Sequence, residues 1–185
     1  MSATITITAA TPADAPAIAA IYAHHVVHGT ATFEIVPPAA EEIARHLREV
    51  LEAGWPWLVA RDAADVVLGY AYAAQLGPRA AYRLACEDSV YLRHDRLGEG
   101  IGSALLTALI TAAGQAGFRQ MVALIADDGS TDSQPASVVL HERAGFAPCG
   151  RLQSVGRKHG RWLDLIYMQR ALGMGDSAPP GEEPQ

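Results

Sequence analysis

The sequence is poor in cysteine and contains no long uninterrupted apolar run. Its 185 residues include two cysteines, Cys86 and Cys149, which lie far apart and form no Cys-x-x-Cys pair. A disulfide framework or a zinc site is therefore not indicated, and reduced thiols in a cytoplasm are the expectation. Residues 1–10 lack the basic and then apolar pattern of a secretion signal, and no segment is apolar enough to cross a membrane.

Positive charge is also scarce. The chain has 14 Lys and Arg residues against 20 Asp and Glu residues, a formal net charge of -6, and no dense basic stripe. Nucleic acids and acidic membrane surfaces are therefore not expected as partners, because both require clustered positive charge. Half of the residues are hydrophobic, which excludes bulk disorder and is enough for one buried core.

Hydrophobic periodicity and turn residues predict an alternation of strands and helices. Thr11-Pro12-Ala13-Asp14 is typical of a helix start, and Gly54, Gly117 and Gly145 follow the ends of later helices. The expected strands cover 4–8, 57–61, 66–76, 89–92, 121–126, 152–155 and 162–169, and the expected helices start at 11 or cover 40–53, 101–116 and 136–144. This order implies an α/β (or α+β) sandwich, a mixed sheet covered by helices. We expect one domain over residues 1–172 and a disordered tail over 173–185, where Gly, Pro, Ser and Glu dominate.

A glycine-rich turn, Leu97-Gly98-Glu99-Gly100-Ile101-Gly102, joins an expected strand to a long helix. Glycines leave backbone N–H groups accessible at the positive end of a helix, which is a favourable site for a diphosphate. No G-x-x-x-x-G-K-S/T pattern is present, and the spacing differs from the G-x-G-x-x-G of dinucleotide folds. A glycine-rich helix start without a ligand is the simpler alternative.

Several motifs occur together in an order that resembles the Gcn5-related N-acetyltransferase (GNAT) family, and within it the phosphinothricin acetyltransferase-like branch. They are Thr32-Phe33-Glu34, Glu87-Asp88-Ser89-Val90-Tyr91, the glycine turn, Leu140-His141-Glu142 with Gly145-Phe146, and Gly156-Arg157-Lys158-His159-Gly160-Arg161-Trp162-Leu163-Asp164. The resemblance implies a mostly antiparallel sheet of about seven strands flanked by helices. It also implies a homodimer that transfers acetyl from acetyl-CoA, without a metal, to phosphinothricin, methionine sulfoximine or methionine sulfone.

The resemblance assigns cofactor binding to the end of the fourth strand, the glycine turn and one later serine. These residues are Val90, Tyr91, Leu92, Leu97, Gly98, Glu99, Gly100, Ile101, Gly102, Ser103 and Ser137. Backbone N–H groups around Tyr91 and Leu92 are the implied oxyanion donors. The chain departs from the family pattern where Leu97 replaces a Gln or Arg, and where Glu99 replaces a residue that is commonly basic.

Glu87 is the implied general base, a carboxylate that takes the proton of the acceptor ammonium directly or through one water. It is expected just before the fourth strand, where a solvated acid is the simpler alternative. His141 is the second implied catalytic residue, either ordering that water or supplying a proton near the sulfur; a packing histidine is the alternative.

Phe33, Glu34, Arg79 and Tyr82 match the family's acceptor region, and Arg79 is suited to pair with a carboxylate or phosphinate. Lys158, His159 and Arg161 form an expected basic turn, either solvated or at a subunit contact. Two other functions stay open: acetyl transfer to another amine, such as a polyamine or a peptide N-terminus, and a coenzyme A sensor without turnover.

Overall fold

The computed structural model describes residues 5–130 and 134–180, in which the elements follow the predicted order. The strands are β1 (Thr6–Ala9), β2 (Trp57–Arg61), β3 (Val67–Gln75), β4 (Ala85–Leu92), β5 (Gln120–Asp127), β6 (Ala147–Lys158) and β7 (Arg161–Ala171). The helices are α1 (Ala15–His28), α2 (Ala40–Glu52), α3 (Ile101–Gln115) and α4 (Ala136–Arg143). Short 3-10 turns η1 (Pro12–Asp14), η2 (Ala80–Tyr82) and η3 (His94–Arg96) lie between them.

The seven strands form one sheet in the order β1-β2-β3-β4-β5-β7-β6. Every neighbouring pair is antiparallel except β4 and β5, which run parallel near the middle of the sheet. The prediction of a mixed, mostly antiparallel sheet flanked by helices is confirmed.

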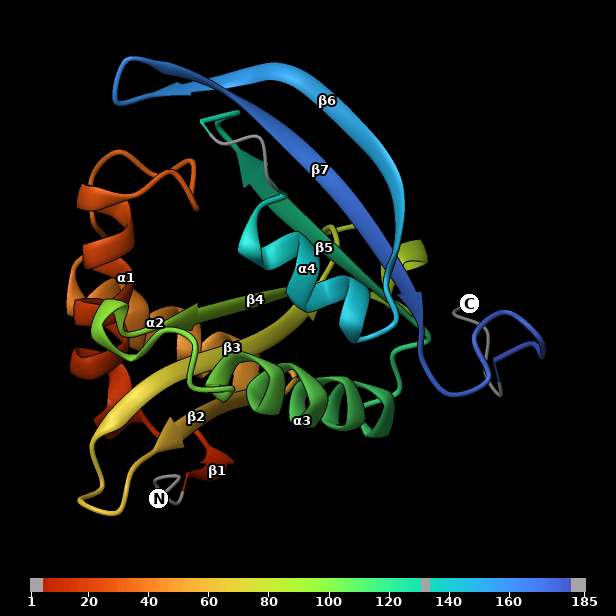
Figure 1. Cartoon of the computed structure of the whole chain (residues 1–185). Helices are drawn as coiled ribbons and strands as arrows, with labels where there is room; N and C mark the ends of the chain where they lie inside the picture. Colours follow the sequence, from red (N-terminus) through yellow and green to blue (C-terminus); the bar gives the residue numbers. More distant parts are fainter. Residues whose placement is uncertain (1–4, 131–133, 181–185) are drawn as a thin grey trace.

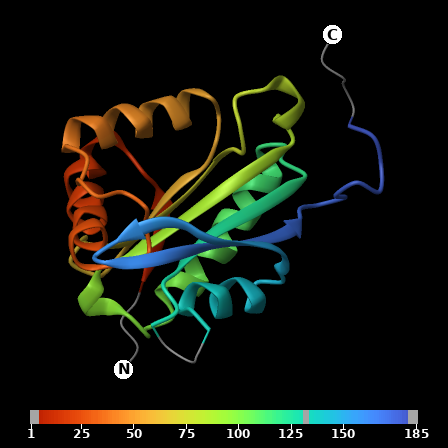
Figure 2. The ribbon, with the colours of Figure 1, turned by 90° about the horizontal axis from the view of Figure 1, so that it is seen from above.

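Helices cover both faces of the sheet (Figures 1 and 2). On one face, α1 and α2 pack on β2 and β3 through a cluster that includes Ile18, Leu47 and Trp57. On the other face, α3 dominates a second cluster that includes Leu105 and Met121. The two clusters are separate because strand residues point alternately to the two faces.

Two strand boundaries differ from the prediction. β4 begins at Ala85, before the predicted start at Ser89, so that Glu87 lies inside the strand and not ahead of it. β6 runs from Ala147 to Lys158, far beyond the predicted 152–155, because pairing with β7 overrides the turn preference of Pro148, Gly150 and Gly156. The basic turn is thereby reduced to His159 and Gly160.

The start of the predicted tail lies against the body of the protein. The Arg119 guanidinium donates hydrogen bonds to the carbonyl oxygens of Gly175 (2.9 Å) and Ala178 (2.7 Å). Residues 181–185, which the prediction of disorder also covers, lie outside the described residues.

Candidate active site

β4 separates two chemical environments through the alternation of its side chains. Glu87, Ser89 and Tyr91 line a cavity on the face that carries α1 and α2. Cys86 and Asp88 are buried on the opposite side, toward α3 and α4. Burial raises the pKa of the Cys86 thiol to about 12, so this thiol is not a nucleophile at neutral pH.

The cavity has a volume of about 550 Å³, which is in the range of small-molecule sites. Aromatic side chains form much of its wall. The Trp57 and Tyr72 rings stack with centroids 4.2 Å apart, and the Tyr70 and Tyr91 rings stack at 5.6 Å. Tyr22 meets Tyr91 edge-on at 4.9 Å. The cavity therefore offers an aromatic enclosure for a small acceptor.

The Glu87 carboxylate is the acid that β4 presents to this enclosure. It is half-buried, and among the described residues it has no hydrogen-bond or ion-pair partner. Burial, together with the neighbouring Asp88 charge, raises the pKa of Glu87 above its ordinary value of 4.5. A carboxylate with a raised pKa and free lone pairs is suited to accept a proton from an ammonium group.

The predicted acceptor residues divide into two pairs. Phe33 and Glu34 line the cavity, together with Ala31 and Thr32 of the same loop. Arg79 and Tyr82 do not line it, because they lie in and beside η2 between β3 and β4. The Tyr82 ring packs against Gly77 there, and the Arg79 carbonyl accepts a hydrogen bond from the Gln75 side chain.

Helix α2 contributes polar residues that the sequence analysis missed. Glu42, Arg45, His46 and Glu49 all line the cavity. Their spacing of three and four residues places them on one side of the helix, next to the apolar stripe that contains Leu47. That polar stripe is the signal by which they could have been found. Arg45 is the only Arg or Lys in the cavity wall, and it has no ion-pair partner among the described residues.

His141 is buried and lies on the other side of β4 from Glu87. Its Nδ1–H donates to the Ser137 carbonyl oxygen (2.6 Å), and its Nε2 lies 3.0 Å from Oδ2 of Asp88. Burial acts to lower the pKa of His141, but the hydrogen bond and charge of Asp88 and the Ser137 carbonyl raise it above the ordinary 6.5. The geometry describes an imidazolium paired with a carboxylate, and it does not bring His141 to Glu87 or into the cavity wall.

β4 and β5 diverge beside this pair. Their parallel pairing ends at Asp88 and Ala123, although both strands continue. The Leu76 N–H donates a hydrogen bond to the Ala85 carbonyl oxygen, and the Arg93 N–H donates one to the Leu68 carbonyl oxygen. Because alternate residues of an antiparallel strand direct their backbone groups to the same neighbour, the odd-numbered residues of β4, including Tyr91, direct their N–H and C=O groups to β3. The N–H groups of Val90 and Leu92 face the gap, whereas the Leu92 carbonyl oxygen accepts a hydrogen bond from Nε2 of His25 (2.7 Å). Of the two expected oxyanion donors, only the Leu92 N–H is therefore directed into the gap.

The glycine turn opens α3 at the end of this gap. Gly98 and Gly100 have φ angles of 78° and 82°, a left-handed conformation that glycine adopts without strain. A side chain added at either position would meet nothing within 4 Å, so the turn is open on its outer side. The N–H groups in the first turn of α3, from Ile101 to Ser103, have no partner within the helix, an arrangement that suits a diphosphate.

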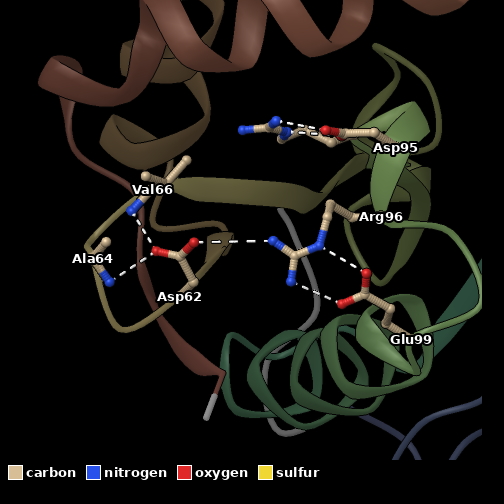
Figure 3. A network of polar contacts seen from close by, with 7 residues as sticks. Asp62, Ala64, Val66, Asp95, Arg96 and Glu99 are labelled. Carbon is tan, nitrogen blue, oxygen red and sulfur yellow. Dashed lines mark hydrogen bonds and ion pairs between the residues drawn. The ribbon is translucent and has the colours of Figure 1, made fainter. Parts of the chain in front are cut away.

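Glu99 is engaged by a neighbouring arginine. The Arg96 guanidinium donates to both Glu99 carboxylate oxygens, at 2.7 and 2.8 Å, and lies 3.9 Å from Asp62 (Figure 3). Asp62 also accepts hydrogen bonds from the N–H groups of Ala64 and Val66 in the β2–β3 turn. Arg96, which lies in the turn that precedes Gly98, is therefore neutralised by acids.

A second hollow, about 630 Å³ in volume, lies between β1 and α3. Ser103 is one of its lining residues, and among the described residues no acid, base or cysteine lines it. Within the described ranges, no cluster of His, Cys, Asp or Glu is arranged to hold a metal ion, and no helix is long and apolar enough to span a membrane.

Comparison with known proteins identifies the class. The sequence profile of the Acetyltransferase (GNAT) domain matches residues 7–167, so the chain belongs to this family. It is an acetyl-CoA-dependent N-acetyltransferase. The open glycine turn, the free N–H groups that follow it and the unpaired edge of β4 fit this cofactor.

Within this family, the chain is similar to several individual enzymes. The chain is 49% identical, over 90% of its length and 82% of the relative, to a phosphinothricin N-acetyltransferase of Alcaligenes faecalis. It is 42% identical, over 90% of its length and 94% of the relative, to an L-methionine sulfoximine/L-methionine sulfone acetyltransferase of Pseudomonas aeruginosa. A phosphinothricin acetyltransferase from Sinorhizobium meliloti, solved with acetyl-CoA, superposes with a TM-score of 0.91 at 42% identity, covering 98% of this chain and 95% of the other.

Proposed function

We propose that the enzyme acetylates the α-amine of a small amino-acid-like acceptor, of the phosphinothricin, methionine sulfoximine or methionine sulfone type, with Glu87 as the general base. The relatives that act on these compounds support the acceptor class. The observation that carries the mechanism is the unpartnered Glu87 carboxylate, which has a raised pKa and points into the aromatic cavity beside the divergence of β4 and β5.

In this mechanism acetyl-CoA supplies an activated acetyl group, held by the glycine turn and the free edge of β4. Glu87 accepts a proton from the acceptor ammonium, which frees the nitrogen lone pair to form the new C–N bond. The Leu92 N–H faces the gap and is positioned to stabilise negative charge on the acetyl oxygen. The C–S bond breaks, the nitrogen loses a second proton as the amide forms, and the departing thiolate takes up one proton, so that the products are the amide, coenzyme A and the proton held by Glu87.

His141 is proposed to act from the cofactor side of β4. The two predicted roles were ordering a water at Glu87 and supplying a proton near the sulfur, and a place on the sulfur side fits the geometry better. Its positive charge is fixed by Asp88 and by the Ser137 carbonyl, on the same side of the sheet as α3 and its glycine turn. A fixed positive charge favours the thiolate that forms when the C–S bond breaks.

Replacing Glu87 with glutamine tests the base. Turnover, followed as thiol release with amino-acid sulfones, sulfoximines and phosphinates, should fall by roughly 10²- to 10⁴-fold. Acetyl-CoA affinity, measured by calorimetry, should be unchanged because Glu87 is directed away from the cofactor face. Glu52→Gln on the exposed end of α2 is the matched control. A Glu87→Gln enzyme with full activity would remove Glu87 from the role of base. In the wild type, kcat/KM should fall as the pH drops through the raised pKa of Glu87.

One observation favours a second acceptor class. Four acids line the cavity, namely Glu34, Glu42, Glu49 and Glu87, against Arg45 alone. This excess of negative charge attracts amines that carry a second positive charge. Spermidine and putrescine therefore belong in the same assay. If they react and the amino-acid sulfones do not, the enzyme is a polyamine acetyltransferase.

We further propose that the enzyme is a homodimer in the cytoplasm. Ile35, Val36 and Trp162 are 72%, 74% and 61% exposed, and Leu152 and Val155 on β6 add further apolar surface. Exposed apolar side chains gathered on one hairpin and the loop after α1 fit the covered face of a dimer. The free thiols of Cys86 and Cys149 fit a reducing compartment.

A further inference from the structure

Residues 31–34 form a loop that lines the acceptor cavity, and the β6–β7 hairpin from the other end of the chain holds this loop in place. Lys158, near the tip of the β6–β7 hairpin, is 5% exposed, and its Nζ donates a hydrogen bond of 2.9 Å to the Thr32 carbonyl oxygen. Thr32 is itself buried and lines the cavity. Both views show the hairpin reaching across to the segment that follows α1 (Figures 1 and 2). Lys158 is thus a tether for the wall and not the solvated turn residue that the sequence suggested.

Gly156 on the same strand makes room for the ring of Phe33. A Cβ atom built on Gly156 would lie 2.3 and 2.4 Å from two atoms of that ring, a distance that no real contact allows. The backbone of Gly156 is not left-handed, so any residue could adopt it. The need for glycine here therefore comes from Phe33, which is 39% exposed and lines the cavity.

The tethered wall is connected to β4. The Thr32 hydroxyl and the Tyr22 hydroxyl are hydrogen-bonded at 2.8 Å, and the Tyr22 ring meets the Tyr91 ring edge-on. On the other side of the loop, Asp128 accepts hydrogen bonds from Thr30 (3.2 Å) and from Arg161 of β7 (2.8 Å). A displacement of the hairpin is thus transmitted to the side chains that enclose the acceptor.

We infer that Gly156 and Lys158 of the β6–β7 hairpin are positioning residues that set acceptor affinity, by fixing Phe33 and Thr32 in the cavity wall. This inference rests on the proposed function, because it requires that the cavity binds the acceptor amine. The cofactor binds along β4 and the glycine turn, away from this contact. The hairpin therefore controls the affinity for the acceptor and leaves the affinity for acetyl-CoA unaffected.

Gly156→Ala tests the inference, with Gly150→Ala as the matched control. Gly150 lies on the same strand, and its added Cβ would approach its nearest neighbour only to 4.0 Å. We expect Gly156→Ala to raise the acceptor KM about tenfold while kcat and the acetyl-CoA KM change less than about twofold, the pattern of lost ground-state binding. Thermal unfolding should differ little from the wild type, because the exposed ring can turn outward. Gly150→Ala should match the wild type in both measurements.

A Phe33→Ala background makes the test specific. Removal of the ring removes the clash, so Gly156→Ala should have no further effect on the acceptor KM in that background. Lys158→Met should raise the acceptor KM in the same selective way, and Lys158→Arg should restore part of the affinity.

Three results would overturn the inference. The first is an unchanged acceptor KM in an active Gly156→Ala enzyme, which leaves the proposed function intact. The second is an equal rise in both KM values, which indicates general damage. The third is a wild-type enzyme that acetylates no small amine, in which case the proposed function fails and the inference fails with it.

Discussion

Replacing Asp88 with alanine should destabilise the protein, and the loss should depend on pH. Asp88 and His141 have side chains that are 1% and 4% exposed, so alanine leaves a buried imidazolium without its partner. Breaking a buried ion pair in this way costs roughly 3–5 kcal/mol. For a chain of this length, that corresponds to a fall in Tm of roughly 6–20 °C.

The sign of the pH dependence follows from the raised pKa of His141. A group whose pKa is higher in the folded state contributes stability that is fully present below its unfolded pKa and is lost as the pH rises through its folded pKa. The difference between wild type and Asp88→Ala should therefore be largest near pH 6. Once the pH has risen through the raised pKa, the imidazole is neutral in both proteins, and the remaining loss of about 1–3 kcal/mol is that of an unsatisfied hydrogen bond.

Urea unfolding at pH 6 and pH 9 measures the loss in free energy of unfolding at each pH. Asp88→Asn is the informative control, because its amide can donate to a neutral imidazole and should cost less than alanine at both pH values. A loss below about 1 kcal/mol at pH 6, or equal losses at the two pH values, would show that His141 is not held as an imidazolium.

Two further predictions concern the surface. Glu99→Gln frees Arg96 and removes a negative charge beside the free N–H groups of α3, so the acetyl-CoA KM should fall roughly two- to fivefold at low salt and less at high salt; a higher KM would contradict this. Trp162→Glu places a charge in the exposed apolar surface of the hairpin, so light scattering should show a shift from dimer to monomer, whereas an unchanged dimer would place the interface elsewhere.

The order of elements could be predicted from the sequence because helix periodicity, capping residues and glycine stops are local signals. The start of β4 could not. Glu87 and Asp88 are adjacent acids, a pair that resembles a loop, and only pairing with β3 and β5 makes them part of a strand. The predicted strand at 152–155 was shorter than β6 for a similar reason. The Pro and Gly residues of β6 are typical of turns, and the pairing with β7 that makes them part of a strand is long-range.

The candidate site was predicted in part. Glu87, Phe33 and Glu34 line one cavity as expected, and the glycine turn opens α3. Glu87 and His141 lie on opposite sides of β4 because side chains alternate along a strand. This separation could not be predicted while Glu87 was placed before the strand. The polar stripe of Arg45 and its neighbours on α2 is a local signal, but its place in the cavity wall depends on long-range packing of that helix against the sheet.

The burial of Cys86 has a practical consequence for the bench. Its sulfur lies 3.5 Å from the Gln120 carbonyl oxygen, deep under α3, and its pKa of about 12 keeps it protonated at any pH used for assays. A dye that detects free coenzyme A by disulfide exchange will therefore titrate Cys149 alone in the folded enzyme. The background is one equivalent per chain, and a second equivalent that appears over time reports unfolding in the same cuvette.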